Sequence, residues 1–209
     1  MLKVYGDIYS GNCYKIRLLA AQLGIAHEWR HVDILQKQTR TPEFLAKNPN
    51  GRIPLLQLDS GECLAESNAI LHYLAEGSAL LPADRLLHAQ VLQWMFFEQY
   101  SHEPYIATSR YIIRYLGRPP EQEARLLERV PGGKAALAVM DRHLQDHTFF
   151  VGARYSIADI ALYAYTHVAH EGGFDLEPYV ALRAWLARVA SQPCYAGMDQ
   201  FDTAIRAAG

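Results

Sequence analysis

Patterns typical of β-strands occur only in the first part of this 209-residue chain, and this asymmetry limits the folds open to it. Up to residue 76, short apolar runs alternate with helical patterns, whereas from Arg85 onward every long pattern has helical spacing. Residues 77–84 gather Gly, Ser and Pro in a short polar stretch, as expected for a linker. The sequence therefore predicts two domains, 1–76 and 85–209, joined by residues 77–84.

Capping and turn signals separate the elements predicted for the first domain. Ser10 precedes a helical apolar pattern that ends at Gly24, and Thr41 and Pro42 suit an N-cap and a first helical position. The expected elements are a strand over 2–5, a helix up to Gly24, a strand over 28–32, a helix from Thr41, a hairpin with strands over 55–58 and 62–64, and a helix over 66–76. This order, β-α-β-α-β-β-α, predicts an α/β domain.

The second domain is predicted to be all-helical. Its amphipathic stretches cover residues 85–116, 121–147, 157–170 and 179–190, and Pro131-Gly132-Gly133 is expected to interrupt the second of them. Ser156 and Asp159 have the spacing of a capping box, with Asp in place of the usual Glu. The residues after Asp159 are apolar nearly all round, so this box is expected to start a buried helix and to serve stability rather than chemistry.

Composition argues against several classes of function. The 20 basic and 22 acidic residues give a formal net charge of -2, so no nucleic-acid partner is expected. The chain has neither an apolar run long enough to cross a bilayer nor an opening like a signal peptide, so we expect a cytoplasmic protein without membrane contact. Its three widely spaced cysteines and scattered histidines lack metal-ligand spacing, so no metal is expected.

Four segments in the right order resemble motifs of the cytosolic glutathione S-transferase family. They are Tyr9-Ser10-Gly11-Asn12-Cys13-Tyr14-Lys15-Ile16-Arg17, Asn48-Pro49-Asn50-Gly51-Arg52-Ile53-Pro54, Glu66-Ser67-Asn68-Ala69-Ile70 and the capping box at 156–159. The first is similar to the catalytic segment of bacterial proteins with a serine (zeta- or nu-like) active site. The resemblance implies a thioredoxin-like N-terminal domain followed by an all-helical C-terminal domain.

The resemblance also implies that Ser10 and Asn12 stabilise the thiolate of glutathione. Lowering a thiol pKa by about two units takes roughly 2.7 kcal/mol, which one hydrogen bond to the anion and a helix N-terminus can supply. Ser10 is placed to donate that bond, and Asn12 can share the work. An alternative is Cys13, since a thiol at a helix N-terminus can itself be reactive.

Other parts of glutathione are expected to meet the remaining motifs. The resemblance implies a cis bond between Ile53 and Pro54, whose backbone pairs with the cysteinyl part of the peptide. It implies that Ser67 binds the γ-glutamyl carboxylate and Glu66 the ammonium. Lys37 and Arg52 are the cations considered for the glycine carboxylate, because Gly51 stands where some classes place a histidine.

A small hydrophobic electrophile is expected in a cleft beside the thiolate. Its candidate lining residues are Glu98, His102, Tyr105, Ser109 and Tyr165, on a stretch expected to bend or break at Pro104. The family further implies a homodimer. Three functions remain open: a glutathione transferase, a glutathione-dependent disulfide reductase or peroxidase, and a non-catalytic module that binds glutathione or a partner.

Overall fold

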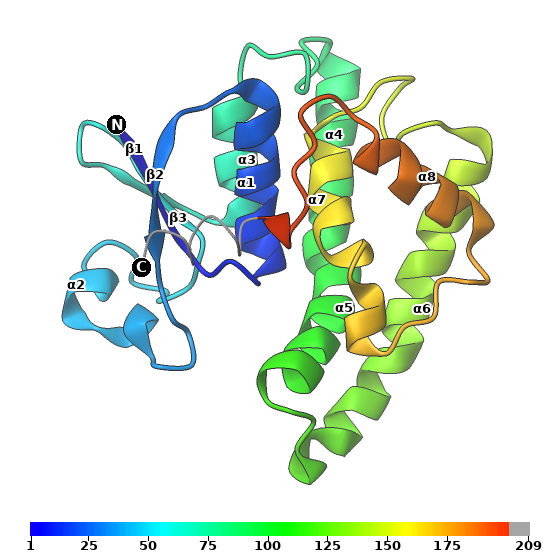
Figure 1. Ribbon diagram of the computed structural model, residues 1–209. Coiled ribbons are helices and arrows are strands. Elements are labelled where there is room, and N and C mark those ends of the chain that lie inside the picture. The colour runs from blue at the N-terminus through cyan, green and yellow to red at the C-terminus, as the bar shows by residue number, and fades with distance from the viewer. Residues whose placement is uncertain (201–209) are drawn as a thin grey trace. The chain divides into compact units, whose positions relative to one another are not determined.

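The computed structural model describes residues 1–200 of the chain (Figure 1). Contacts within the chain divide it into two compact units. One consists of residues 1–76 together with the segment that begins at Pro193, and the other spans residues 77–192. The first unit is α/β and the second is helical, which confirms the predicted fold class.

A four-stranded mixed sheet forms the centre of the first unit, with strand order β2-β1-β3-β4. Its strands are β1 (Leu2–Gly6), β2 (His27–His31), β3 (Leu55–Gln57) and β4 (Cys63–Ala65). β1 runs parallel to β2, with Leu2 opposite His27, and antiparallel to β3, with Val4 opposite Leu56. β3 and β4 form the predicted hairpin.

Helices cover the two faces of this sheet unequally. α1 (Gly11–Leu23) and α3 (Ser67–Ala75) pack side by side on one face, and the short α2 (Pro42–Leu45) lies on the other (Figure 1). The side chains of successive β1 residues point to opposite faces of the sheet. A β-carbon on Gly6 would lie 2.7 Å from Sγ of Cys13 on α1, whereas the Tyr5 ring packs 6.4 Å from the Phe44 ring on α2.

The second unit contains helices only. They are α4 (Arg85–Phe97), a π-helical segment (Glu98–His102), α5 (Glu103–Arg110), a second π-helical segment (Tyr111–Tyr115), α6 (Glu123–Asp146), α7 (Ile157–Thr166) and α8 (Val180–Ala190). Single 3₁₀ turns occur at Gln38–Arg40 in the first unit and at Pro120–Gln122 and Ala169–Gly172 in the second. The break expected near Pro104 is the first π-helical segment, which ends just before it.

The expected interruption at Pro131-Gly132-Gly133 is wrong, because α6 runs through all three residues. Proline has no backbone N–H, so Pro131 cannot donate to the carbonyl of Leu127 four residues earlier. Both residues are exposed, so water can hydrate that carbonyl. The glycines allow close packing instead of ending the helix. A β-carbon on Gly132 would overlap the Tyr105 ring, and one on Gly133 would overlap the Phe174 ring.

The predicted capping box starts α7 and is buried. Asp159 Oδ2 accepts the backbone N–H of Ser156 at 3.0 Å, and the Ser156 hydroxyl accepts the N–H of Ala158 at 3.3 Å. Every residue of α7 is buried, as expected from its apolar sequence. Across residues 1–200, no helix combines the length and apolar character needed to cross a bilayer.

Candidate functional site

The N-terminal ends of α1 and α3 meet, and they bring two predicted site residues together. The Ser67 hydroxyl, at the start of α3, donates to Oδ1 of Asn12, in the first turn of α1, at 3.1 Å. Lys15, one turn further along α1, donates from Nζ to Ser67 Oγ and to Asn68 Oδ1, each at 3.2 Å. Helix N-termini carry partial positive charge, so this junction favours an anionic ligand.

Ser10 is the N-cap of α1. Its backbone is extended, with φ -72° and ψ 124°, and its Oγ accepts the N–H of Cys13 at 3.4 Å. A hydroxyl has one proton and two lone pairs. Capping uses a lone pair only, so it is compatible with donating the proton to a thiolate.

Buried polar groups hold the loop that carries Ser10. Asp7 Oδ1 accepts the backbone N–H of Tyr9 at 2.7 Å, and Arg17 Nη1 donates to the carbonyl of Ile8 at 3.0 Å. Both Asp7 and Arg17 are buried. Burial lowers the pKa of the Arg17 guanidinium to about 10, so it remains charged at neutral pH.

The Cys13 side chain lies inside the first unit. Its exposed fraction is 0%, and burial raises the pKa of its thiol to about 12 against the opposing hydrogen bond with Ser10. A thiol with this pKa remains protonated at neutral pH and is a poor nucleophile. The geometry therefore favours a packing role for Cys13 over the alternative of a reactive cysteine.

The peptide bond between Ile53 and Pro54 is cis, as the family resemblance implied. Pro54 is buried and Ile53 half-buried at the entrance to β3. Asn48 shapes the turn before them: its Nδ2 donates to the carbonyl of Arg52 at 2.8 Å, and its Oδ1 accepts the N–H of Asn50 at 3.1 Å.

Glu66 precedes α3 in a backbone conformation that side chains rarely adopt, with φ 67° and ψ 115°. Its side chain is exposed, while the next side chain, Ser67, is buried. Strained residues of this kind cost about 1–3 kcal/mol and concentrate at functional sites. The turn at Glu66 thus changes the chain direction where the predicted head-group subsite begins.

A cation that the sequence analysis did not consider, Arg40, lies beside the turn at Asn50 and Gly51. Lys37 and Arg52 are both exposed. Arg40, which sequence reasoning missed, donates from Nη1 to the carbonyl of Asn50 at 3.2 Å. A β-carbon on Gly51 would overlap that guanidinium, so Arg40 takes up the space beside the turn where a side chain at Gly51 would stand.

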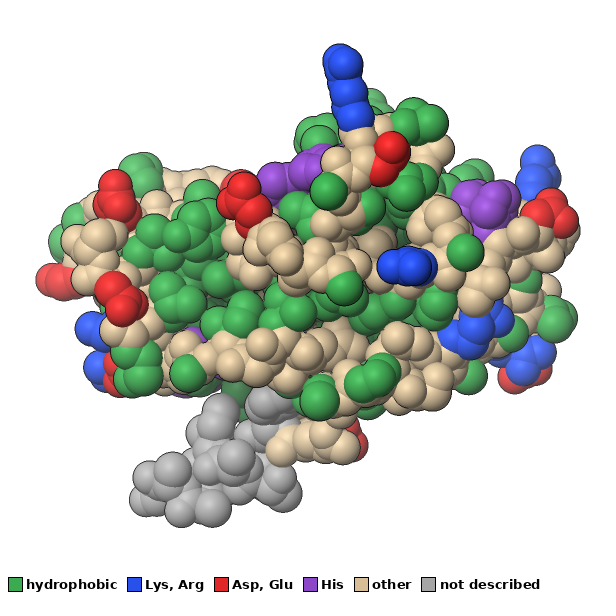
Figure 2. Space-filling view, turned by 90° about the horizontal axis from the view of Figure 1, so that it is seen from above, with side chains coloured by type: hydrophobic (Ala, Val, Ile, Leu, Met, Phe, Trp, Pro, Cys, Tyr) green, Lys and Arg blue, Asp and Glu red, His purple; other side chains and the backbone are tan. Residues whose placement is uncertain are grey.

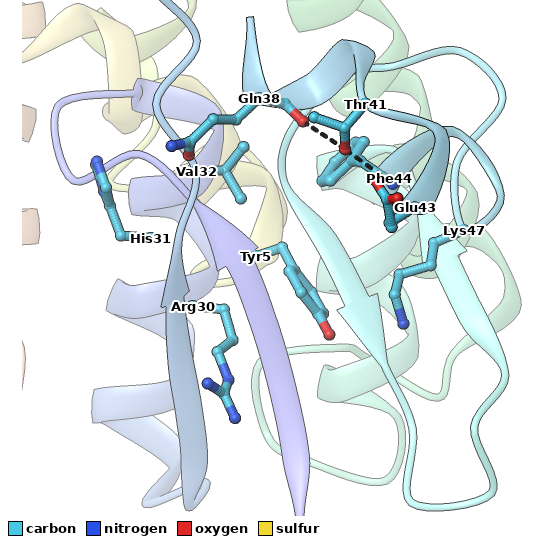
Figure 3. Close-up of a pocket in the computed structure, with 9 residues that line it drawn as sticks. All are labelled: Tyr5, Arg30, His31, Val32, Gln38, Thr41, Glu43, Phe44 and Lys47. Carbon is cyan, nitrogen blue, oxygen red and sulfur yellow. Dashed lines mark hydrogen bonds between the residues drawn. The ribbon is translucent and has the colours of Figure 1, made fainter. Parts of the chain in front are cut away.

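A hollow of about 360 Å³ lies on the α2 side of the sheet (Figure 3). Its lining residues are Tyr5, Arg30, His31, Val32, Gln38, Thr41, Glu43, Phe44 and Lys47. None of the residues predicted for the glutathione site is among them. The hollow is therefore distinct from the junction of α1 and α3.

The residues predicted to line the electrophile pocket all lie in the second unit. Glu98, His102, Ser109 and Tyr165 are buried, and Tyr105 is half-buried. His102 Nε2 forms a hydrogen bond with the Thr166 hydroxyl at 3.0 Å, and Gln99 Nε2 donates to Glu98 Oε2 at 2.9 Å. The Tyr105 ring rests against Gly132 of α6, with the Arg129 guanidinium 5.9 Å from its centroid.

Charges of both signs are interspersed on the face of the molecule that Figure 2 shows. Apolar and neutral side chains and backbone cover most of this face between the charged ones.

Models of two protein families match the chain. One is described as the N-terminal domain of glutathione S-transferase and matches residues 1–76, and the other is described as the C-terminal domain and matches residues 89–193.

Solved structures give the same picture. A glutathione S-transferase from Pseudomonas fluorescens is 57% identical, with a TM-score of 0.93 over 94% of this chain and 98% of that one. A glutathione transferase from Pseudomonas putida, solved with one glutathione disulfide bound per subunit, is 28% identical, with a TM-score of 0.80 over 92% of this chain and 88% of that one.

Relatives of the chain differ in the functions that their names state. Elongation factor 1-gamma-B of Xenopus laevis is 35% identical over 159 residues, which make up 74% of this chain but only 36% of the relative. The chain thus spans about a third of the length of that relative. The disulfide-bond oxidoreductase YfcG of Escherichia coli is 30% identical over 90% of this chain and 91% of its own length.

Proposed function

Because the chain belongs to the glutathione S-transferase family, we propose that it binds glutathione at the N-termini of α1 and α3 and activates the thiol for attack on an electrophilic small molecule. The observation that carries the proposal is the hydrogen bond between Ser67 and Asn12. It joins the residue proposed for the γ-glutamyl head group to one proposed for the thiol, at a junction with positive potential.

In this proposal, each charged end of glutathione has its own partners. The backbone N–H of Ser67 and the start of α3 bind the γ-glutamyl carboxylate, and the exposed Glu66 carboxylate binds the ammonium. The backbone of Ile53, before Pro54, pairs with the cysteinyl part. Lys37, Arg52 or Arg40 binds the glycine carboxylate.

Ser10 and Asn12 act on the sulfur. A thiolate accepts hydrogen bonds from the Ser10 hydroxyl and the Asn12 amide, and each bond to the anion lowers the thiol pKa. The thiol proton passes to solvent, and the thiolate forms a bond to an electrophilic carbon, which loses a leaving group such as halide or, at a conjugated double bond, takes up a proton. We keep Glu98, His102, Tyr105, Ser109 and Tyr165 as the proposed lining of the electrophile pocket.

We also propose that the protein works as a homodimer. Phe96 and Tyr100 support this, because their aromatic side chains are 69% and 85% exposed in the single chain. Light scattering after gel filtration tests it, with Phe96→Ser and Tyr100→Ser as variants. A monomeric wild-type protein would contradict the proposed dimer.

A second candidate is reduction of disulfides by glutathione. The likeness to YfcG over nearly the whole chain favours this candidate. The same thiolate would attack one sulfur of a disulfide instead of carbon, forming a mixed disulfide and releasing the other sulfur as a thiolate, so the site residues are shared. The third possibility, a non-catalytic module, is suggested by the likeness to part of elongation factor 1-gamma-B.

One set of assays distinguishes these functions. Purified wild-type protein, Ser10→Ala and Asn12→Ala are assayed with a chlorodinitrobenzene-type electrophile, a hydroperoxide and a hydroxyethyl disulfide, and glutathione binding is measured by calorimetry. Ser60→Ala serves as the matched control, because Ser60 lies in the exposed hairpin turn, bonded to Glu62.

The transferase proposal predicts turnover of the electrophile that falls in Ser10→Ala or Asn12→Ala and is unchanged in Ser60→Ala. Turnover of the disulfide alone would favour the second candidate. Binding without turnover of any substrate would favour the third, and absence of glutathione binding would contradict the first two and leave only a module that binds a partner.

A further inference from the structure

Lys15 is a buried cation at the junction of the two helices. Its exposed fraction is 0%, although lysine is almost never fully buried unless it has partners. Two of its hydrogen bonds connect α1 to the start of α3, where Ser67 Oγ and Asn68 Oδ1 accept them. The ammonium therefore links the proposed thiol subsite on α1 to the proposed head-group subsite on α3.

The chemistry of the three groups gives this link a direction. An ammonium can only donate, so the Ser67 hydroxyl accepts from Lys15. The Ser67 proton is then donated to Asn12, whose Oδ1 lies 3.1 Å away. Because the oxygen of the Asn12 amide faces Ser67, its NH₂ group points to another side.

We propose that Lys15 is a positioning residue of the glutathione site. Acting through the Ser67 hydroxyl, it holds the Asn12 amide so that the NH₂ group, the end able to stabilise a thiolate, is presented to the sulfur. This inference rests on the proposed function, and it adds that side chains at the head-group subsite set the acidity of the thiol.

A double-mutant cycle tests the path of this effect. The pKa of bound glutathione is measured from the ultraviolet absorbance of the thiolate during a pH titration. The proteins are wild type, Lys15→Met, Asn12→Ala and the double variant. Lys47→Met is the matched control, because Lys47 is a half-buried lysine of the same unit that donates to Gln57 at 3.3 Å, away from this junction.

We expect Lys15→Met to raise the pKa of the bound thiol by about one unit, roughly the effect of losing one hydrogen bond to an anion. Asn12→Ala should raise it similarly, and the double variant should go no further than Asn12→Ala alone. Lys47→Met should leave it unchanged.

Two results would overturn the inference while leaving the proposed function intact. One is a Lys15→Met variant in which the thiol of bound glutathione has the same pKa as in the wild-type protein. The other is an additive rise in the double variant, which would show that the lysine charge acts directly on the sulfur and not through Asn12. If wild-type protein binds no glutathione, the proposed function and the inference both fail.

Ser67→Ala keeps the test decisive if Lys15→Met does not fold. This variant keeps the Lys15 ammonium and removes only the Ser67 hydroxyl that connects it to Asn12. The inference predicts a raised thiol pKa in Ser67→Ala and no further rise when Asn12→Ala is added. An unchanged pKa in Ser67→Ala would overturn it.

Discussion

Trp185 on α8 donates its indole N–H to Oδ1 of Asp159 on α7 at 2.9 Å. The same oxygen accepts the backbone N–H of Phe150 at 3.1 Å, so one carboxylate joins two helices and the segment before them. Burial opposes the charged form more strongly than these bonds favour it. The result is a pKa for Asp159 raised to about 6.

This raised pKa predicts a pH-dependent difference between wild type and Asp159→Asn. The folded state binds a proton at higher pH than the unfolded state, whose Asp titrates at about 3.8. Protonated Asp159 therefore stabilises the folded state fully below about pH 4, and this contribution is lost as the pH rises through about 6. Wild-type stability relative to Asp159→Asn should fall by about 3 kcal/mol between about pH 4 and pH 7, measured by urea unfolding. A difference independent of pH would contradict the raised pKa.

His167 should act in the opposite direction. Its Nδ1–H donates to the carbonyl of Tyr163 at 2.9 Å, and burial lowers its pKa to about 4. As the pH falls, this histidine binds a proton in the unfolded chain before it does so in the folded protein. The stabilising contribution of neutral His167 is therefore fully present above about pH 6.5 and is lost as the pH falls through about 4. The stability advantage of wild type over His167→Phe should therefore shrink by about 3 kcal/mol between about pH 7 and pH 4. A wild-type advantage over His167→Phe that is the same at both pH values would contradict the lowered pKa of His167.

The strained backbone of Glu66 predicts a trade-off between stability and binding. Glu66→Gly relieves the conformation at φ 67°, whereas Glu66→Ala keeps it. By thermal unfolding, Glu66→Gly should be more stable than Glu66→Ala by about 1 kcal/mol. By calorimetry, both should bind glutathione more weakly than wild type, because both lack the carboxylate. Equal stability of the two variants would argue against strain at this residue.

Gly132→Ala should destabilise the protein even though alanine is the better helix former. The new methyl group overlaps the Tyr105 ring, and overpacking of this kind costs about 1–3 kcal/mol. Chemical denaturation measures the effect, with Lys134→Ala as the exposed control on the same helix. Adding Tyr105→Ala should make the cost of Gly132→Ala small. A stabilising Gly132→Ala would show that the helices can separate freely.

Arg40 should contribute more to glutathione affinity than Lys37 or Arg52. Its guanidinium is already held beside the turn by the carbonyl of Asn50, so less side-chain entropy is lost on binding. We expect Arg40→Ala to weaken binding about tenfold, the scale of one charge-assisted hydrogen bond. The same substitution should have no effect on binding of γ-glutamylcysteine, which lacks the glycine carboxylate. An equal loss for both peptides would place Arg40 outside that subsite.

Local signals predicted the elements that carry the proposed site. Ser10 and Thr41 are N-caps, and Gly24 ends α1 in a left-handed conformation, because caps depend on neighbours in sequence. The cis bond before Pro54 followed from family resemblance, since local sequence favours trans at most prolines.

Features that depend on distant contacts were not predictable in the same way. Pro131-Gly132-Gly133 has the local signature of a helix break, but the rings of Tyr105 and Phe174 make the glycines part of close packing between elements. Lys15 has the polar side chain of a surface residue, and only its contacts on α3 explain why it is buried. The segment that begins at Pro193 belongs to the first unit, and no pattern in its own sequence predicts this. A long-range contact holds it there, since Tyr14 Oη donates to the carbonyl of Ala196 at 2.8 Å.

The loop before α1 is held by hydrogen bonds to buried side chains of the same unit. Tyr9 is held through its backbone by Asp7, and Ile8 by Arg17, so the position of Ser10 depends on buried groups of the chain itself. A preorganised loop loses little conformational entropy when it binds, which leaves more of the interaction energy for affinity. Glutathione would thus meet a Ser10 hydroxyl already in place, and selectivity at this end of the site would come from shape set during folding.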